Sequence, residues 1–72
     1  MANFIIRKEH NRRFWHVLRE GRKKTLEYTS TQSLAMDRAE SLCKETGGGV
    51  VSVVLVTSNE EETTLQRIEL RA

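Results

Sequence analysis

The chain has 72 residues and a formal net charge of +2, from 12 Lys or Arg side chains and 10 Asp or Glu. We expect a single domain over residues 1–72 with a thin core, because a chain of this length buries only about 60% of the surface that it exposes when unfolded. One cysteine, Cys43, excludes an internal disulfide, and His10 and His16 lack the Cys/His clusters of a structural zinc site. The single thiol fits a reducing compartment, and no apolar run reaches the about 20 residues of a membrane span, so we expect a cytoplasmic protein with no membrane partner.

The first thirty residues consist of apolar strands joined by polar turns. Residues 3–9 favour a strand because they include one Phe and two Ile before the charged residues begin. Residues 14–19 favour a second strand, and the short polar break before it predicts an antiparallel hairpin. Gly21, which adopts positive φ without a steric penalty, predicts the next turn, and residues 23–29 alternate apolar and polar side chains as a third strand.

A helix is predicted over residues 32–46. Its apolar residues recur with the spacing of one helical face, at Ala35, Ala39, Leu42 and Cys43. The hydroxyl side chains at 29–31 are candidate N-caps, and Gly47 is the expected left-handed residue that ends the helix. We expect the apolar face of this helix to pack on a sheet.

Two strands complete the chain. Residues 50–57 form its most apolar strand, and residues 63–70 form the last strand after a polar loop. The predicted order is therefore β-β-β-α-β-β. We expect an α+β fold in which an antiparallel sheet of four to five strands carries one helix packed on one face.

The strand at 50–57 is apolar on both faces: alternate positions hold Val51, Val53 and Leu55 on one side and Val50, Val54 and Val56 on the other. A strand with one solvated face should instead alternate apolar with polar residues. One helix covers only one face, so we expect a homodimer whose interface includes Val50, Val54 and Val56. Two alternatives stay open: a curled sheet that buries both faces itself, and a dimer in which the strands at 63–70 pair edge to edge.

No motif in the chain indicates catalysis, a metal site or a cofactor. The glycines at 47–49 follow a helix, whereas phosphate-binding glycines precede one, so they are typical of a helix end and a flexible connector. Cys43 lies on the apolar face of the helix, where a free cysteine behaves as a small hydrophobe. The acidic run at 60–62 lacks the alternating ligand spacing of calcium loops, and His16 has no acid or base partner at a useful spacing. The sequence therefore favours a non-enzymatic binding module.

The charges are divided unevenly along the chain. Residues 1–30 hold eight Lys or Arg against three Glu, a net charge of +5, whereas residues 31–72 hold four against seven, a net charge of −3. A basic half predicts an anionic partner, with candidate nucleic-acid contacts at Arg12, Arg13, Arg19, Arg22, Lys23 and Lys24. The alternative is a protein-binding regulator or inhibitor that acts through a sheet edge or an apolar sheet face. Clustering of the basic residues would favour nucleic acid, and their scatter would favour a protein partner.

Three short elements also occur together in a known family. They are a W-x-V strand (Trp15-His16-Val17), a T-x-x-x-A helix start (Thr31-Gln32-Ser33-Leu34-Ala35) and a valine-rich strand (Val50-Val51-Ser52-Val53-Val54). Over residues 15–57 the chain thus resembles a family of small bacterial domains of unknown function. This resemblance implies an architecture, in a bacterial or phage protein, and no activity.

Residues 3–46 have a second resemblance. Three short strands rich in Arg and Lys, with a W-x-V element, precede a helix opened by Thr. This order is similar to the three-strand-plus-helix modules of plant AP2-type factors and of the arm-binding domains of tyrosine integrases. Those modules lay their sheet in the DNA major groove, which implies DNA contacts through the six basic residues given above. Here two further strands follow, and Phe14 and Leu18 lie on the opposite sheet face.

Overall fold

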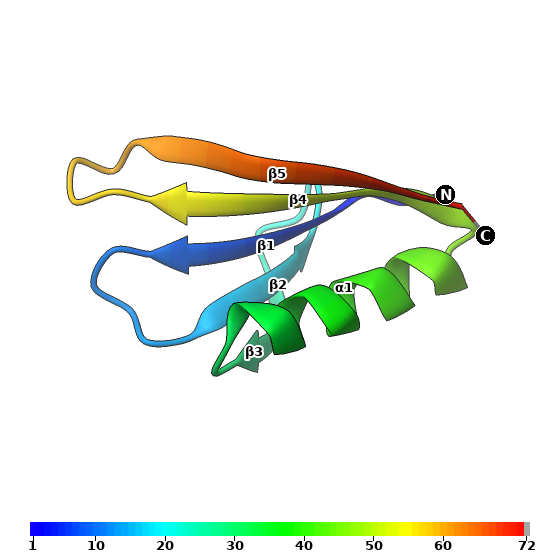
Figure 1. Cartoon of the computed structure of the whole chain (residues 1–72), viewed down its shortest axis with the longest axis horizontal. Coiled ribbons are helices and arrows are strands. Elements are labelled where there is room, and N and C mark those ends of the chain that lie inside the picture. The colour runs from blue at the N-terminus through cyan, green and yellow to red at the C-terminus, as the bar shows by residue number, and fades with distance from the viewer. Residues whose placement is uncertain (72) are drawn as a thin grey trace.

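A computed structural model describes residues 1–71, in which five strands and one helix follow the predicted order (Figure 1). The elements are β1 (Phe4–Glu9), β2 (Trp15–Arg19), β3 (Thr25–Thr29), α1 (Gln32–Glu45), β4 (Gly48–Val56) and β5 (Glu62–Arg71). One helix and one sheet confirm the predicted α+β class. Within the described residues, no helix combines the length and the apolar character needed to cross a membrane.

The sheet is mixed, so the prediction of a purely antiparallel sheet was wrong. Its strand order is β3-β2-β1-β4-β5, and β1 pairs with β4 in parallel while the other neighbours are antiparallel. The reason is the connection through α1. Two successive hairpins return β3 to the direction of β1, and the helix then carries the chain back across the sheet, so that β4 runs in this same direction beside β1.

Local signals determine both ends of α1. The Leu34 amide donates a hydrogen bond to Thr31 Oγ1 at 3.1 Å, which makes Thr31 the N-cap. Gly47, directly after the C-cap, has a φ of +93°, as predicted for the residue that ends the helix. Three of the four predicted face residues, Ala35, Ala39 and Cys43, are fully buried, and Leu42 is half-buried. The predicted docking face of the helix is confirmed.

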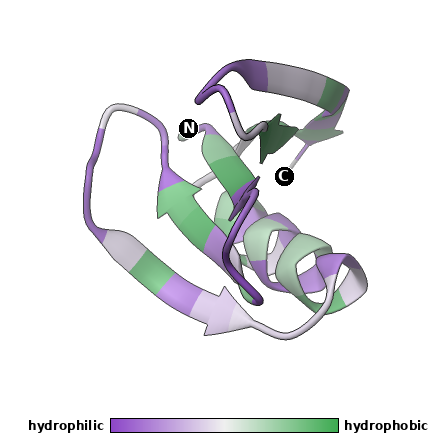
Figure 2. Ribbon diagram, turned by 90° about the vertical axis from the view of Figure 1, so that its left-hand side faces the viewer, coloured by the Kyte–Doolittle hydropathy of each residue, from purple (hydrophilic) through white to green (hydrophobic). Residues whose placement is uncertain are grey.

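The core lies between α1 and one face of the sheet, which bends around the helix (Figure 2). Its strand side chains come from alternate positions: Phe4, Ile6, Trp15, Val17, Val51 and Val53. Each of them is at most 7% exposed. The helix therefore covers the face of β4 that carries Val51, Val53 and Leu55, and Val50, Val54 and Val56 lie on the outer face.

The segment before β1 is tied to the start of β4. The Ala2 amide donates to Gly48 O at 3.1 Å, and the Val50 amide donates to Asn3 Oδ1 at 2.9 Å. Gly49 lies so close to this segment that a Cβ atom on it would stand 2.1 Å from Ala2 O. The glycines at 47–49 thus end the helix and admit the N-terminal segment, rather than acting only as a flexible connector.

The outer face of the sheet, away from α1, is mixed in polarity. Val54 is only 7% exposed within the single chain, and Val50 and Val56 are half-buried. Arg7 on β1 and Thr64 on β5 flank Val54. This partial burial agrees with the curled-sheet alternative, and the dimer interface at the three valines stays a prediction.

Candidate functional site

The predicted nucleic-acid residues fall into two groups on the fold. Arg12 and Arg13 lie in the loop between β1 and β2, whereas Arg19, Arg22, Lys23 and Lys24 lie at the end of β2 and in the turn after it. These connections are at opposite ends of β2 (Figure 1). Its five residues span about 13 Å at the usual rise per residue of a strand. The structure therefore brings four of the six residues together and places the other two elsewhere, so the basic residues neither form the single cluster expected of a nucleic-acid surface nor scatter completely.

The turn between β2 and β3 is held in place by backbone hydrogen bonds. Gly21 has a φ of +84°, which glycine adopts without the steric cost that other residues meet. The Arg22 amide donates to Arg19 O at 3.0 Å and closes the turn. The Glu20 amide donates to Asn3 O at 2.8 Å and ties the turn to the segment before β1. The basic side chains thus extend from an anchored backbone.

Three of these basic residues line a groove beside the C-terminal half of α1, which we call the basic groove. Its lining residues are Arg19, Arg22 and Lys24 together with Phe4, Leu26, Leu42 and Thr46. Lys23 lies in the same turn and is exposed. The groove has a volume of about 270 Å³, slightly below the about 300 Å³ at which small-molecule sites begin. This size suits one small anionic group and an adjoining apolar part.

A β-bulge contributes to the apolar floor of the basic groove. The register between β2 and β3 shifts at Val17 and Leu18, which leaves Leu26 as the extra residue on β3. A bulge redirects side chains locally. Leu26, 52% exposed, consequently lines the groove with Leu42, whereas simple alternation predicts that it shares a face with Tyr28.

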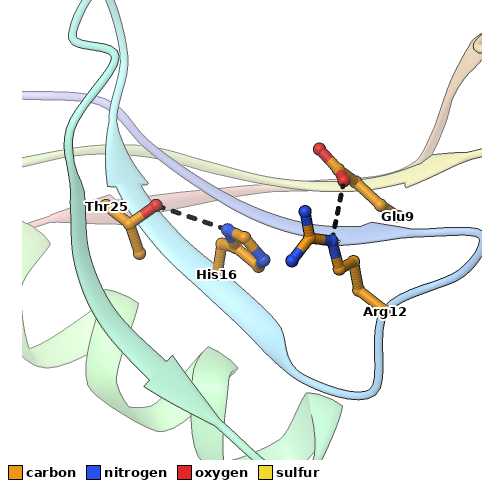
Figure 3. A network of polar contacts seen from close by, with 4 residues as sticks. All are labelled: Glu9, Arg12, His16 and Thr25. Atoms are coloured by element: carbon orange, nitrogen blue, oxygen red, sulfur yellow. Dashed lines mark hydrogen bonds and ion pairs between the residues drawn. The ribbon is translucent and has the colours of Figure 1, made fainter.

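The two basic groups differ in their acidic neighbours. Arg12 Nε lies 3.7 Å from Glu9 Oε2, so a carboxylate offsets the charge of that side chain (Figure 3). The other ion pairs of residues 1–71 are Arg7–Glu62 and Arg38–Glu27. Within this part of the chain, no carboxylate forms an ion pair with the three basic residues of the groove. These three cations are therefore free of a direct carboxylate partner among residues 1–71, and they lie beside the C-terminal end of α1, whose partial negative charge they offset.

The surroundings of His16 and the cavity at the loop ends do not bring several cations together as the basic groove does. His16 is half-buried, with its Nδ1 3.3 Å from Thr25 Oγ1 (Figure 3) and its ring edge-on to Tyr28. A cavity of about 350 Å³ between the β1–β2 and β4–β5 loops is lined by Arg7 together with Glu9 and Glu60, and its one arginine forms an ion pair with Glu62. Residues 1–71 contain no group of three or more His, Cys, Asp or Glu side chains that could hold a metal ion.

Sequence reasoning missed the apolar half of the basic groove. Phe4, Leu26 and Leu42 come from β1, β3 and α1, and no local pattern brings them beside the turn. The signal in the sequence was Leu26, an exposed apolar residue two positions after the basic run at 22–24. Its role depends on the bulge, which follows from the pairing of two strands rather than from the residue itself.

Comparison with protein-family models, with curated proteins and with solved structures finds no match to this chain. The β-β-β-α-β-β order agrees with the architecture that the resemblance to small bacterial domains implied. No match supports the similarity to AP2 or integrase modules. A function must therefore be inferred from the chemistry of the basic groove.

Proposed function

We propose that the protein is a small, non-enzymatic nucleic-acid-binding protein that holds phosphate in the basic groove. The observation that supports this is the convergence of Arg19, Arg22 and Lys24 on one groove, without an ion-pair partner among residues 1–71. Arginine binds phosphate through a planar fork of donors, and lysine binds it as a point charge. Three such groups beside one anchored turn suit a phosphate.

The apolar floor favours a nucleotide over a free inorganic anion. Leu26 and Leu42 would contact a base or the carbons of a sugar while the basic side chains contact the phosphate. Phosphate contacts do not read sequence, so we expect an affinity that is independent of sequence and sensitive to salt. Single strands expose their base faces and should bind more tightly than a short duplex.

The test compares two double variants that remove equal charge. Arg22→Ala with Lys24→Ala removes two cations from the basic groove, and Arg12→Ala with Arg13→Ala removes two from the opposite end of β2. Fluorescence anisotropy with a labelled oligonucleotide gives the affinity at salt concentrations from about 50 to about 200 mM. Removal of one cation that binds a phosphate should reduce the slope of log affinity against log salt by about 0.7 on single strands and about 0.9 on duplex DNA.

The R22A/K24A variant should show up to twice this reduction in slope. The R12A/R13A variant should show a smaller reduction in slope. Circular dichroism checks that both variants keep the fold. Equal reductions in the two variants would contradict the assignment to the basic groove. Failure of the wild-type protein to bind any oligonucleotide at low salt would refute the nucleic-acid function itself.

A second candidate function is that of a protein-binding regulator that acts through a sheet edge. The observation that favours it is β5, an edge strand of ten residues in which only Ile68 and Leu70 are even half-buried. Its outer backbone groups are open to pairing with another strand. A chain that binds no nucleic acid in the assay above would make this candidate the leading one.

A further inference from the structure

The strand β5 is the longer of the two edges of the sheet. It has ten residues, against five in β3 at the opposite edge. Natural edge strands are commonly protected by short length, by proline, by charged side chains, lysine above all, or by a bulge. β5 contains neither proline nor lysine, and its bulge lies opposite Val53 and Val54, so residues 66–71 form a regular run. The outer backbone groups of this run have no neighbouring strand within the described chain.

The register with β4 shows which face each side chain of this run takes. Gln66, Ile68 and Leu70 lie opposite Val53, Val51 and Gly49, on the side of the helix. Arg67, Glu69 and Arg71 lie opposite Ser52, Val50 and Gly48, on the outer face. The outer face of this run thus carries charges that alternate in sign, and the helix side carries the apolar residues Ile68 and Leu70 after the polar Gln66.

We propose that two copies of the chain pair antiparallel along β5, about a twofold axis at Ile68. In this register Arg67 lies opposite Glu69 of the partner subunit, and Glu69 lies opposite Arg67 of the partner subunit. Ile68 meets Ile68 of the partner subunit on the helix side. The two sheets join into one continuous sheet through main-chain hydrogen bonds.

The charges and the length of the regular run together select this register. In an antiparallel pair related by a twofold axis perpendicular to the sheet, opposite residues share a face, so the axis must lie at a residue. An axis at Arg67 places that side chain opposite its own copy. An axis at Glu69 places Glu69 opposite its own copy and Arg67 opposite Arg71 of the partner subunit. Like charges directly opposite destabilise a sheet and opposite charges stabilise it, so these two axes are disfavoured. An axis at Leu70 sets Glu69 opposite Arg71 of the partner subunit but overlaps only residues 69–71 of the described strand, and an axis at Gln66 sets Arg67 opposite the bulge at Leu65 of the partner subunit. The axis at Ile68 is therefore favoured, because it pairs opposite charges over a longer regular run.

A second copy of the chain fits this edge because the charge pattern is complementary to itself. An isologous contact uses the same strand on both copies and closes without growing into a fibre. Of the three valines predicted for a face-to-face interface, Val54 is already only 7% exposed within one chain, so such a contact would bury little more of that side chain. Edge pairing also satisfies backbone groups that a face contact leaves open.

Charge reversal in the full chain tests the proposal. Arg67→Glu places acidic side chains opposite each other, and Glu69→Arg places basic side chains opposite each other, so each variant alone should be monomeric. An equal mixture of the two variants should form a heterodimer, because every acidic position then meets a basic one. The double variant R67E/E69R should regain the homodimer. Sedimentation velocity distinguishes the 8.3 kDa monomer from a particle of twice that mass.

Arg13→Glu is the matched control for R67E, because it makes the same charge change in an exposed loop away from β5. It should stay dimeric, whereas each single reversal on β5 should raise the dissociation constant at least about tenfold. A wild-type chain that remains monomeric at every concentration overturns the proposal. If the dimer persists in both R67E and E69R, the proposed register is wrong. If the dimer persists in R67E but is lost in a Val50→Lys variant, the interface lies on the outer face of the sheet instead.

Discussion

Replacement of Gly49 by alanine should destabilise the protein through a collision with the N-terminal segment. Gly49 has a φ of +149°, and strain of this kind costs an L-residue about 1–3 kcal/mol. The new Cβ would stand 2.1 Å from Ala2 O and 2.9 Å from Ala2 C, both backbone atoms. The segment before β1 must therefore move away from β4.

This movement breaks two hydrogen bonds, from the Ala2 amide to Gly48 O and from the Val50 amide to Asn3 Oδ1. Each contributes about 0.5–1.5 kcal/mol, so that the strain and the two broken bonds together amount to about 2–6 kcal/mol. A chain of 72 residues has a total stability of about 4–11 kcal/mol at the usual value per residue. The substitution therefore removes a large fraction of the stability.

Gly21→Ala is the matched control for G49A. Gly21 has a φ of +84°, but no atom lies within 4 Å of its expected Cβ, so this variant meets the strain alone, about 1–3 kcal/mol. Urea unfolding followed by the fluorescence of Trp15, the sole tryptophan and only 7% exposed, measures both variants. Equal losses of unfolding free energy in the two variants would refute the importance of the close approach at Gly49.

Two further substitutions test the packing of α1 on the sheet and the N-cap of α1. Ala39→Leu should cost about 1–3 kcal/mol, because Ala39 is fully buried against the sheet and added methylenes overpack the core. The exposed Ser41→Leu on the same helix is its control, and an equal melting temperature for the two would contradict the packing. Thr31→Ala should cost about 1 kcal/mol by removing the N-cap bond from the Leu34 amide, whereas Thr31→Ser should keep it. Thermal unfolding monitored by circular dichroism measures this loss, and a T31A melting temperature equal to that of T31S would contradict the cap.

The elements and their faces were predictable because they follow from local periodicity. Ala35, Ala39 and Cys43 recur with the spacing of one helical face, and a helix can bury them only by presenting that face to the sheet. The cap at Thr31 and the positive φ at Gly47 each depend on a few neighbouring residues. Such features can be read within a short window of sequence.

Strand order and the candidate site were less predictable because they depend on distant pairing. The parallel neighbours β1 and β4 bring Phe4 opposite Val51, a contact determined by the path of α1 over the sheet. The position of Leu26 in the lining of the basic groove likewise depends on the register between β2 and β3. Arg13 and Arg19 are close in sequence, but the strand between them places them at opposite ends of the sheet.

The proposed β5 pairing and the basic groove would act together on duplex DNA. A twofold axis perpendicular to the sheet keeps both helices, and hence both grooves, on one side of the joined sheet. With strands about 4.8 Å apart, a groove beside β2 and β3 lies about 19 Å from the axis, so two grooves on a flat sheet would be about 38 Å apart. The sheet bends around the helix (Figure 2), so the distance between the grooves is shorter than on a flat sheet and nearer to the about 34–36 Å of one DNA helical turn.

Two phosphate sites at this spacing would gain affinity on one duplex because binding at the first raises the effective concentration at the second, without any new contact. Duplex affinity should therefore depend on β5 pairing, whereas a short single strand, which occupies one groove, needs only the monomer.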